Sequence, residues 1–249
     1  MKKIYLAALT LAMTACVSND DLNPVDNYGY IDVNVSNDPI MQTRGTQVVS
    51  DLNNWVVLAS DNSVETEDIR LTTASTKVKA GKYTVSAKSH ASAAEALTDN
   101  HDWGAAYYEG TSGEVTVTAG QPADAVVNCG TAKNARLKVQ FSLIGNFTGY
   151  SLTAERGLVF NSENAASALA YYAATEEVDY TLKYKYNNGA EKTITGKITM
   201  KGAATENTIS IASNDNGTIS VTVNYDDTFG TGNSQNLEFD AATGEEVKK

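Results

Sequence analysis

Few residues in this 249-residue chain have side chains that could support catalysis or bind a metal ion. There are only two histidines and two cysteines. His90, Glu95, His101 and Asp102 lie close together in the sequence, but their spacing matches neither the HExxH pattern nor the paired CxxC motifs of zinc sites. We therefore expect no metal site and no cofactor.

Cys129 is a further candidate for chemistry, because a thiolate beside a histidine base can act as a nucleophile. It follows the apolar segment 125–128, and nothing in the sequence places His90 or His101 next to it. We interpret it as a free, buried thiol that packs like a small apolar side chain. No Ser/His/Asp set, phosphate-binding glycine loop or dinucleotide fingerprint is recognisable in the sequence. The sequence therefore predicts a protein that is not an enzyme.

Trp103, Tyr107 and Tyr108 form an aromatic group that allows two interpretations. Exposed rings could stack on the apolar faces of sugars, as in glycan-binding sandwiches. Alternatively, Trp103 and one tyrosine pack into the end of a sandwich and cover its core. Both interpretations stay open, and these three residues are the candidate glycan-stacking residues.

The charge of the chain limits its partners. Lys and Arg number 19 against 30 Asp and Glu, which gives a net charge of -11 and a pI near 4.6. Binding to nucleic acid needs clustered Lys and Arg, whose contacts with phosphates release counterions. We therefore expect no nucleic-acid partner.

The first residues are expected to direct the chain to a membrane. Two lysines precede the apolar run 4–13, which is too short to span a bilayer and is typical of a secretory signal peptide. The stretch Met13-Thr14-Ala15-Cys16 resembles a bacterial lipobox, in which the cysteine is acylated and begins the mature chain; Met13 departs mildly from the preferred leucine. We expect a lipoprotein signal peptide over 1–15 and a lipidated Cys16, held in the membrane by its acyl chains. The alternative is an ordinary signal peptide with an incidental cysteine.

The segment after Cys16 indicates where the anchored protein is sent. Val17–Asp21 is polar and acidic, and it resembles the signal that exports lipoproteins of Bacteroidetes to the outer face of the outer membrane. A solvated tether would have the same composition. We expect a flexible tether over 16–27 and a body that is anchored in the outer membrane and faces the exterior.

The rest of the chain alternates polar and apolar residues, as half-buried strands require. The clearest strands are Ile31–Val35, Tyr83–Ala87, Leu137–Phe141, Tyr180–Tyr186, Ile194–Met200 and Ile219–Tyr225. Asn-Gly pairs at 188–189 and 216–217 favour tight hairpins. The long amphipathic helices that connect parallel strands are missing, so we expect antiparallel pairing throughout. The sequence predicts an all-β fold of antiparallel, Greek-key-type sandwiches.

The length of the chain suits two sandwich domains. We place the division in the polar stretch after Cys129, which gives an N-terminal domain over 28–132 and a C-terminal domain over 133–249. Short helices are expected at Ser92–Leu97 and Glu163–Leu169. In the polar C-terminal tail, Leu237–Phe239 is the strand candidate, and we expect fraying beyond it.

Several segments together resemble a family of Bacteroidetes outer-surface lipoproteins of unknown function, with tandem β-sandwiches of the fimbrillin-like or transthyretin-like type. They are the lipobox at Cys16, Tyr30–Val35, Thr43–Gly45, Ala80–Val85, Tyr107–Gly110 and Val115–Gly120. Fimbrillin-type subunits are similar in having an arginine after the first strand, where a protease can cut. The resemblance implies Arg44 as a candidate processing site, whose cleavage would release a strand and leave a groove for a strand of the next subunit. The alternative is that Arg44 lies in an ordinary loop.

The sequence as a whole predicts a non-enzymatic, lipid-anchored protein of the cell surface that acts in adhesion or as a fimbria-related structural component. The alternative is a glycan-binding accessory lipoprotein of a polysaccharide-uptake system. The expected partners are the membrane, through the lipid anchor, and other surface proteins or glycans.

Overall fold

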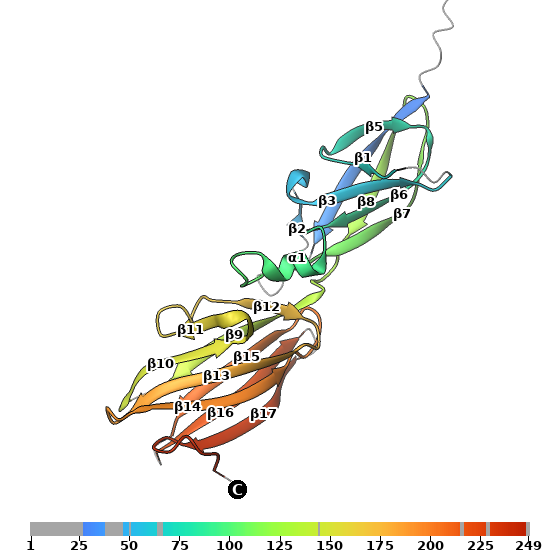
Figure 1. The fold of residues 1–249 in the computed structure, drawn as a ribbon. Coiled ribbons are helices and arrows are strands. Elements are labelled where there is room, and N and C mark those ends of the chain that lie inside the picture. The colour runs from blue at the N-terminus through green and yellow to red at the C-terminus, as the bar shows by residue number, and fades with distance from the viewer. Residues whose placement is uncertain are drawn as a thin grey trace, which may run out of the picture.

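The computed structural model describes residues 27–37, 47–49, 51–63, 67–143, 145–214, 217–227 and 230–247. Almost every regular element is a β-strand, and the strands form two layered bodies that follow one another along the chain (Figure 1). We call residues 27–132 the N-terminal half and residues 133–247 the C-terminal half. None of the described helices is long and apolar enough to cross a bilayer.

The N-terminal half consists of two sheets. One sheet has the order β4-β3-β6-β7. In the other sheet β1 is central: β8 pairs with one edge of β1, and β5 and β2 pair with different parts of its other edge. The elements are β1 (Tyr28–Asn37), β2 (Gln47–Val48), η1 (Leu52–Asn54), β3 (Val56–Asp61), β4 (Ile69–Arg70), β5 (Ser75–Lys79), β6 (Gly81–Lys88), α1 (Ala93–Thr98), β7 (Glu109–Val117) and β8 (Pro122–Asn128).

The C-terminal half also has two sheets, with the orders β11-β10-β13-β14 and β12-β9-β15-β16-β17. The elements are β9 (Asn134–Ser142), β10 (Phe147–Ala154), η2 (Glu155–Gly157), β11 (Leu158–Asn161), β12 (Ala170–Ala173), β13 (Glu177–Tyr186), β14 (Glu191–Thr199), β15 (Glu206–Ser213), β16 (Thr218–Asp227) and β17 (Gly230–Asp240).

The two halves repeat the same strand topology. The sheet β4-β3-β6-β7 corresponds strand for strand to β11-β10-β13-β14, and β5-β1-β8 corresponds to β12-β9-β15. In both halves the first strand pairs parallel with the strand that closes the repeat, β1 with β8 and β9 with β15. β16 and β17 extend the C-terminal sheet beyond β15, whereas no strand in the described ranges pairs with the outer edge of β8.

Each half has its own core, because alternate residues of its strands point between the two sheets. In β1, Ile31, Val33 and Val35 are buried, and the residues between them are not. One cluster of buried side chains runs from Ile31 to Ala132, and a second runs from Ala135 to Ala241. Burying a Val, Leu or Ile side chain contributes about 1.5–3 kcal/mol, so both clusters stabilise their sandwiches strongly. The all-β sandwich prediction is confirmed; the division into domains at 132 and 133 stays a prediction.

The prediction that all strands pair antiparallel is wrong for two pairs, β1–β8 and β9–β15. Between β1 and β8 the chain passes through the facing sheet, and so it does between β9 and β15. The connection that a parallel pair needs is therefore made of strands, and no long helix is required.

Of the two expected helices, one forms and one does not. α1 begins after Ser92, whose Oγ accepts a hydrogen bond from the Glu95 N–H at 3.1 Å as an N-cap. The expected helix at Glu163–Leu169 is wrong: this segment is a series of turns. The Asn161 side chain accepts from the N–H groups of Glu163 and Asn164 at 2.9 and 3.1 Å, which competes with helical hydrogen bonding.

The C-terminal strand is longer than the expected Leu237–Phe239, since β17 spans Gly230–Asp240. The chain after it is also ordered by hydrogen bonds, so the expected fraying is wrong as far as Val247. Asp240 Oδ1 accepts from the N–H groups of Ala242 and Thr243 at 2.9 and 2.8 Å, and Val247 N–H donates to Glu238 O at 2.8 Å. A capped turn thus folds the tail back onto β17.

Candidate functional site

The loop after α1 lies at the junction of the two halves (Figure 1), and its backbone angles are unusual. Three consecutive residues, Asn100, His101 and Asp102, have positive φ angles of 50°, 56° and 68°. L-residues in this left-handed region are strained by about 1–3 kcal/mol each, and such strain concentrates at functional sites. Gly104 follows with a φ of 76°, and a Cβ there would lie 3.0 Å from Tyr171 Cβ. The junction therefore requires glycine at this position.

This loop forms one wall of a hollow of about 690 Å³, which we call the junction groove. The other wall comes from the turns that precede β12 in the C-terminal half and from β12 itself. The lining residues are Asn100, His101, Trp103, Gly104, Asn164, Ser167, Ala168, Leu169 and Tyr171. The groove is thus built by both halves and falls within the size range of small-molecule sites, about 300–1,000 Å³.

Contacts across the junction hold the two walls together. The Tyr171 N–H donates to Trp103 O at 2.7 Å. The Arg156 guanidinium donates to the main-chain oxygens of Leu97 and Tyr171, and its carbon lies 4.4 Å from the centre of the Tyr172 ring. Because Leu97 lies in the last turn of α1, its carbonyl is free to accept from a cation. Arg156 therefore ties α1 to the C-terminal half.

The three candidate stacking residues do not form one exposed platform. Trp103 is partly exposed in the junction groove. Its ring makes an edge contact with the ring of Phe160, with 5.0 Å between the ring centres. Tyr107 and Tyr108 are only 5% and 6% exposed. Tyr108 stacks on Trp55 at 6.3 Å, inside the N-terminal half. The structure therefore leaves Trp103 available to a ligand and buries both tyrosines.

Tyr107 lies just before β7 and is held in place by two hydrogen bonds. Its hydroxyl donates to Glu109 Oε2 at 2.8 Å, and its N–H donates to the side chain of Asn134 at 3.0 Å. Burial and then the bond to Glu109 raise the pKa of Tyr107 to about 12. This tyrosine stays protonated at neutral pH and serves the packing of the junction.

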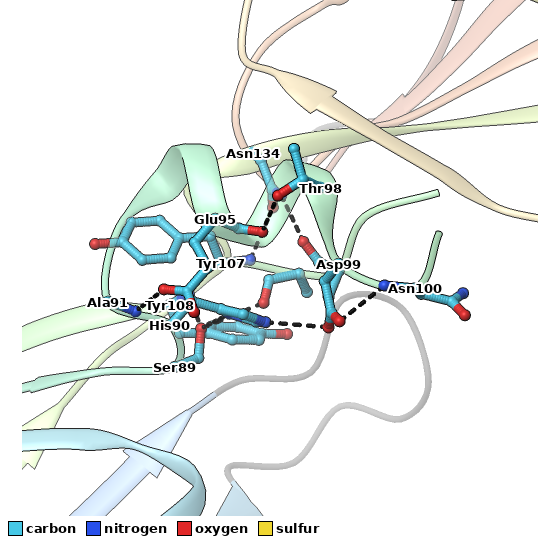
Figure 2. Close-up of polar contacts among 12 residues, drawn as sticks. Ser89, His90, Ala91, Glu95, Thr98, Asp99, Asn100, Tyr107, Tyr108 and Asn134 are labelled. Atoms are coloured by element: carbon cyan, nitrogen blue, oxygen red, sulfur yellow. Dashed lines mark hydrogen bonds and ion pairs between the residues drawn. The ribbon is translucent and has the colours of Figure 1, made fainter. Parts of the chain in front are cut away.

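The structure brings together a serine, a histidine and an aspartate that the sequence did not reveal as a set (Figure 2). Ser89 Oγ lies 3.0 Å from His90 Nδ1, and His90 Nε2 lies 3.4 Å from Asp99 Oδ2. The main-chain N–H of Asn100, followed by the His90 side chain, lowers the pKa of Asp99. The adjacent Ser89 and His90 were visible in the sequence as a possible hydroxyl–imidazole pair. The approach of Asp99 to His90, however, depends on the path of the chain through α1.

This set has the wrong surroundings for a nucleophile. Ser89 Oγ also accepts from the Tyr108 N–H at 2.9 Å and lies 3.4 Å from Ala106 O, so three neighbours already engage it. We interpret the three side chains as a structural network that joins the end of β6 to the α1 loop and to the start of β7.

The other candidates for chemistry are placed as follows. Cys129 is buried, its Sγ lies 3.8 Å from Ala87 O, and burial raises its pKa to about 11. Within the described ranges no group of three or more His, Cys, Asp or Glu side chains could hold a metal ion. Cys16 and Arg44 lie outside the described residues, as do the expected signal peptide and nearly all of the tether.

A second surface that sequence reasoning missed is the outer face of the sheet around β1. Tyr28 and Tyr30 of β1 are 38% and 41% exposed, and Val126 of β8 is 62% exposed. All three alternate with buried neighbours, so they point away from the core on the same sheet. We call this the β1–β8 face. It borders the outer edge of β8, where backbone N–H and C=O groups have no strand partner among the described residues.

A family model described as "Domain of unknown function (DUF4493)" matches residues 27–241 of the chain. No curated protein matches it in sequence.

Among solved structures, the chain is similar to a fimbrial assembly protein from Parabacteroides distasonis, with 10% identity and a TM-score of 0.44, covering 84% of this chain and 99% of that one. It is also similar to a candidate cell adhesion protein from Bacteroides fragilis, with 12% identity and a TM-score of 0.37, covering 78% and 96%. At these TM-scores the similarities assign no function to this chain.

Proposed function

The chain belongs to the DUF4493 family. We propose that it is a non-enzymatic protein of the cell surface. It would take part in adhesion or in the assembly of fimbria-like structures through the β1–β8 face. The partner is another protein subunit, which contributes an extended strand to the outer edge of β8. The observation that carries this proposal is the outer edge of β8, which pairs with no strand among the described residues, together with the exposed apolar residues beside it.

The internal repeat supports this role for β8. In the C-terminal half the equivalent strand, β15, is paired on its outer edge with β16 over Glu206–Ser213. Ile219, Val221 and Val223 of β16 alternate with polar residues and are buried against the second core. The chain therefore contains, in its own second half, the kind of strand that the edge of β8 accepts. An antiparallel strand with alternating apolar residues is the expected contribution of the partner.

The position of β1 supports processing at Arg44 as part of the same function. β1 lies inside its sheet, and Arg44 belongs to the segment that links β1 to β2. Cleavage after Arg44 would separate β1 from the rest of the chain, and release of β1 would leave a groove between β8 and β5 for a strand of the next subunit. N-terminal sequencing of protein purified from cells is expected to find chains that begin at Gly45, and Arg44→Ala is expected to abolish them.

Anchoring through Cys16 belongs to the chain before cleavage at Arg44, because cleavage separates Cys16 from all residues after Arg44. The first described strand begins at Tyr28, which leaves the expected tether between it and the acylated cysteine. Labelled palmitate is expected to enter the wild-type chain and not the Cys16→Ser variant. The Cys16→Ser variant would keep the same sandwiches as the wild-type chain, so loss of the label with an unchanged circular dichroism spectrum identifies the anchor.

The central test compares two exposed valines. Val126 lies on the β1–β8 face, and Val159 lies on β11 of the other half with 40% exposure. Val126→Lys is expected to abolish the adhesion of cells that display the chain, or the association of the chain with its partner subunit. Val159→Lys is expected to leave both intact. Equal behaviour of the two variants would overturn the role of this face. The second candidate function, glycan binding, is favoured by a different observation, the composition of the junction groove.

A further inference from the structure

We propose that the junction groove binds a neutral carbohydrate. This inference does not depend on the assembly role of the β1–β8 face, since it concerns a different surface and a different class of ligand. It rests on the composition of the groove, on the state of its polar side chains and on the way its walls are held.

The groove contains no lysine, arginine, aspartate or glutamate among its lining residues. The 30 acidic and 19 basic residues of the chain thus lie outside this lining. Phosphate, carboxylate and sulfate ligands need cationic partners, which the lining does not offer, and the net charge of -11 repels them. Cationic ligands would find no carboxylate in the lining. The groove therefore suits an uncharged ligand.

The lining combines aromatic and apolar surface with amide, imidazole and hydroxyl groups. Trp103, Tyr171, Ala168 and Leu169 supply the apolar part. A sugar ring has the matching character, because its C–H groups form apolar patches that lie against aromatic rings while its hydroxyls need hydrogen-bond partners. A purely apolar ligand would leave the polar groups of the lining without partners, which costs binding energy.

Two of these polar side chains are free to bind hydroxyls. The side chains of Asn100 and His101 are exposed and make no hydrogen bond with any residue that the structure describes. By contrast, the amide of Asn164 is engaged, with Nδ2 donating to Val159 O at 2.8 Å and Oδ1 accepting from the Asn161 N–H at 2.9 Å. Asn100 and His101 are therefore the expected hydroxyl-binding residues, and Asn164 shapes the wall.

The walls are fixed before any ligand arrives. The positive φ angles of Asn100 and His101 present both residues beside Trp103, whose ring rests edge-on against Phe160. The bond from Tyr171 N–H to Trp103 O holds the opposite wall at a set distance. A preformed site spares the ligand part of the entropic cost of ordering the protein. The left-handed loop thus has a function that offsets its strain.

The test is affinity electrophoresis of the intact chain in gels that contain one neutral polysaccharide each, namely amylopectin, mannan, arabinan or a β-glucan. A gel with polygalacturonate serves as the anionic counterpart. The wild-type chain is expected to be retarded in at least one neutral gel and not in the anionic one. Retardation only in the anionic gel, or in none of the five, would overturn the proposal.

Variants locate the site. Trp103→Ala is expected to weaken binding in the retarding gel at least tenfold, whereas Trp55→Ala, which removes the other tryptophan, leaves it unchanged. Because loss of Trp103 also removes the contact with Phe160, the double variant Asn100→Ala/His101→Ala is tested beside it, as these side chains support no described contact. Equal retardation of this double variant and the wild type would contradict the assignment.

A spectroscopic readout is independent of gel mobility. In a Trp55→Phe chain, Trp103 is the single tryptophan, since the sequence has two. Adding the retarding polysaccharide is expected to change the Trp103 emission with saturation, and the polygalacturonate is expected to leave it unchanged. An unchanged spectrum at concentrations that retard the chain would place the sugar elsewhere.

Discussion

The side-chain oxygen of Asn134, the first residue of β9, accepts a hydrogen bond from the main-chain N–H of Tyr107 at 3.0 Å. The same amide donates to Ala105 O at 2.7 Å, and Asn134 is only 4% exposed. One side chain of the C-terminal half therefore satisfies two backbone groups of the N-terminal half. It acts as a substitute for a strand partner at the point where the loop after α1 returns to β7.

We predict that Asn134→Ala destabilises the chain by about 1–3 kcal/mol, because it leaves the buried N–H of Tyr107 and the partly buried carbonyl of Ala105 without the side chain that binds them. Urea denaturation followed by circular dichroism measures the change. Asn236→Ala is the control, as Asn236 is exposed and its loss is expected to cost less than about 0.5 kcal/mol. Equal effects of the two substitutions would contradict the structural role of Asn134.

The ion pair between Arg136 and Glu206 joins β9 to β15 in the parallel pairing of the C-terminal half. Arg136 Nε and Nη2 lie 2.8 and 2.7 Å from Glu206 Oε2, and the two side chains are 11% and 16% exposed. We expect Glu206→Ala to lower the free energy of unfolding by about 1–3 kcal/mol, because it removes a carboxylate that binds the guanidinium in a largely buried setting. Lys82 and Glu114 form an exposed pair, and Glu114→Ala is expected to cost less than about 1 kcal/mol.

Two glycines of the same strand, β7, give a matched test of backbone packing between the sheets. A Cβ on Gly110 would lie 2.5 Å from Asn128 O, whereas a Cβ on Gly113 would meet nothing within 4 Å. Gly110→Ala is expected to lower stability by at least about 1–3 kcal/mol, since backbone must move. Gly113→Ala is expected to be neutral or slightly stabilising. Thermal melts of both variants decide this, and equal melting temperatures would show that β7 and β8 are not in close contact at Gly110.

Cys129 gives a prediction about pH. Burial raises its pKa to about 11 in the folded chain, so the folded state keeps the proton that an unfolded thiol loses near pH 8.5. The contribution of this group to stability is therefore complete below the unfolded pKa and falls as the pH rises toward 11. We expect iodoacetamide to leave Cys129 unmodified at pH 8 in the folded chain and to alkylate it in urea, as read by mass spectrometry. Rapid alkylation of the folded chain would show that the thiol is accessible.

Much of the fold could be predicted from the sequence because half-buried strands leave a period-two pattern. The alternation at 31–35, 83–87, 137–141 and 180–186 marks β1, β6, β9 and β13 correctly. The pairing of these strands is a property of the whole chain, and the parallel approach of β1 to β8 leaves no local signal. The helix expected at Glu163–Leu169 failed because Asn161 and Asn164 satisfy the backbone of that segment with their side chains.

The candidate site could be predicted only in part. Trp103 stood out as an aromatic residue in a polar loop, but its partner Tyr171 comes from the other half of the chain and only the fold brings the two together. Tyr107 and Tyr108 had the same appearance in the sequence, but they lie just before β7 and the fold buries both, with Tyr108 stacked on Trp55. The positive φ angles of the loop after α1 could not be predicted, because Asn, His and Asp adopt them more often than other non-glycine residues but not at every position.

The parallel pairing of β1 with β8 also decides how the N-terminal half responds to tension. Tyr28 lies at the end of β1 nearest the N-terminus, and Asn128 ends β8 where the chain leaves for the other half. Pulling these two points apart loads the register from Tyr30↔Pro122 to Ser36↔Asn128 in shear, so that its hydrogen bonds must break together and not one after another. A sandwich of this topology therefore resists a force applied between these two points more strongly than one whose hydrogen bonds are loaded one at a time.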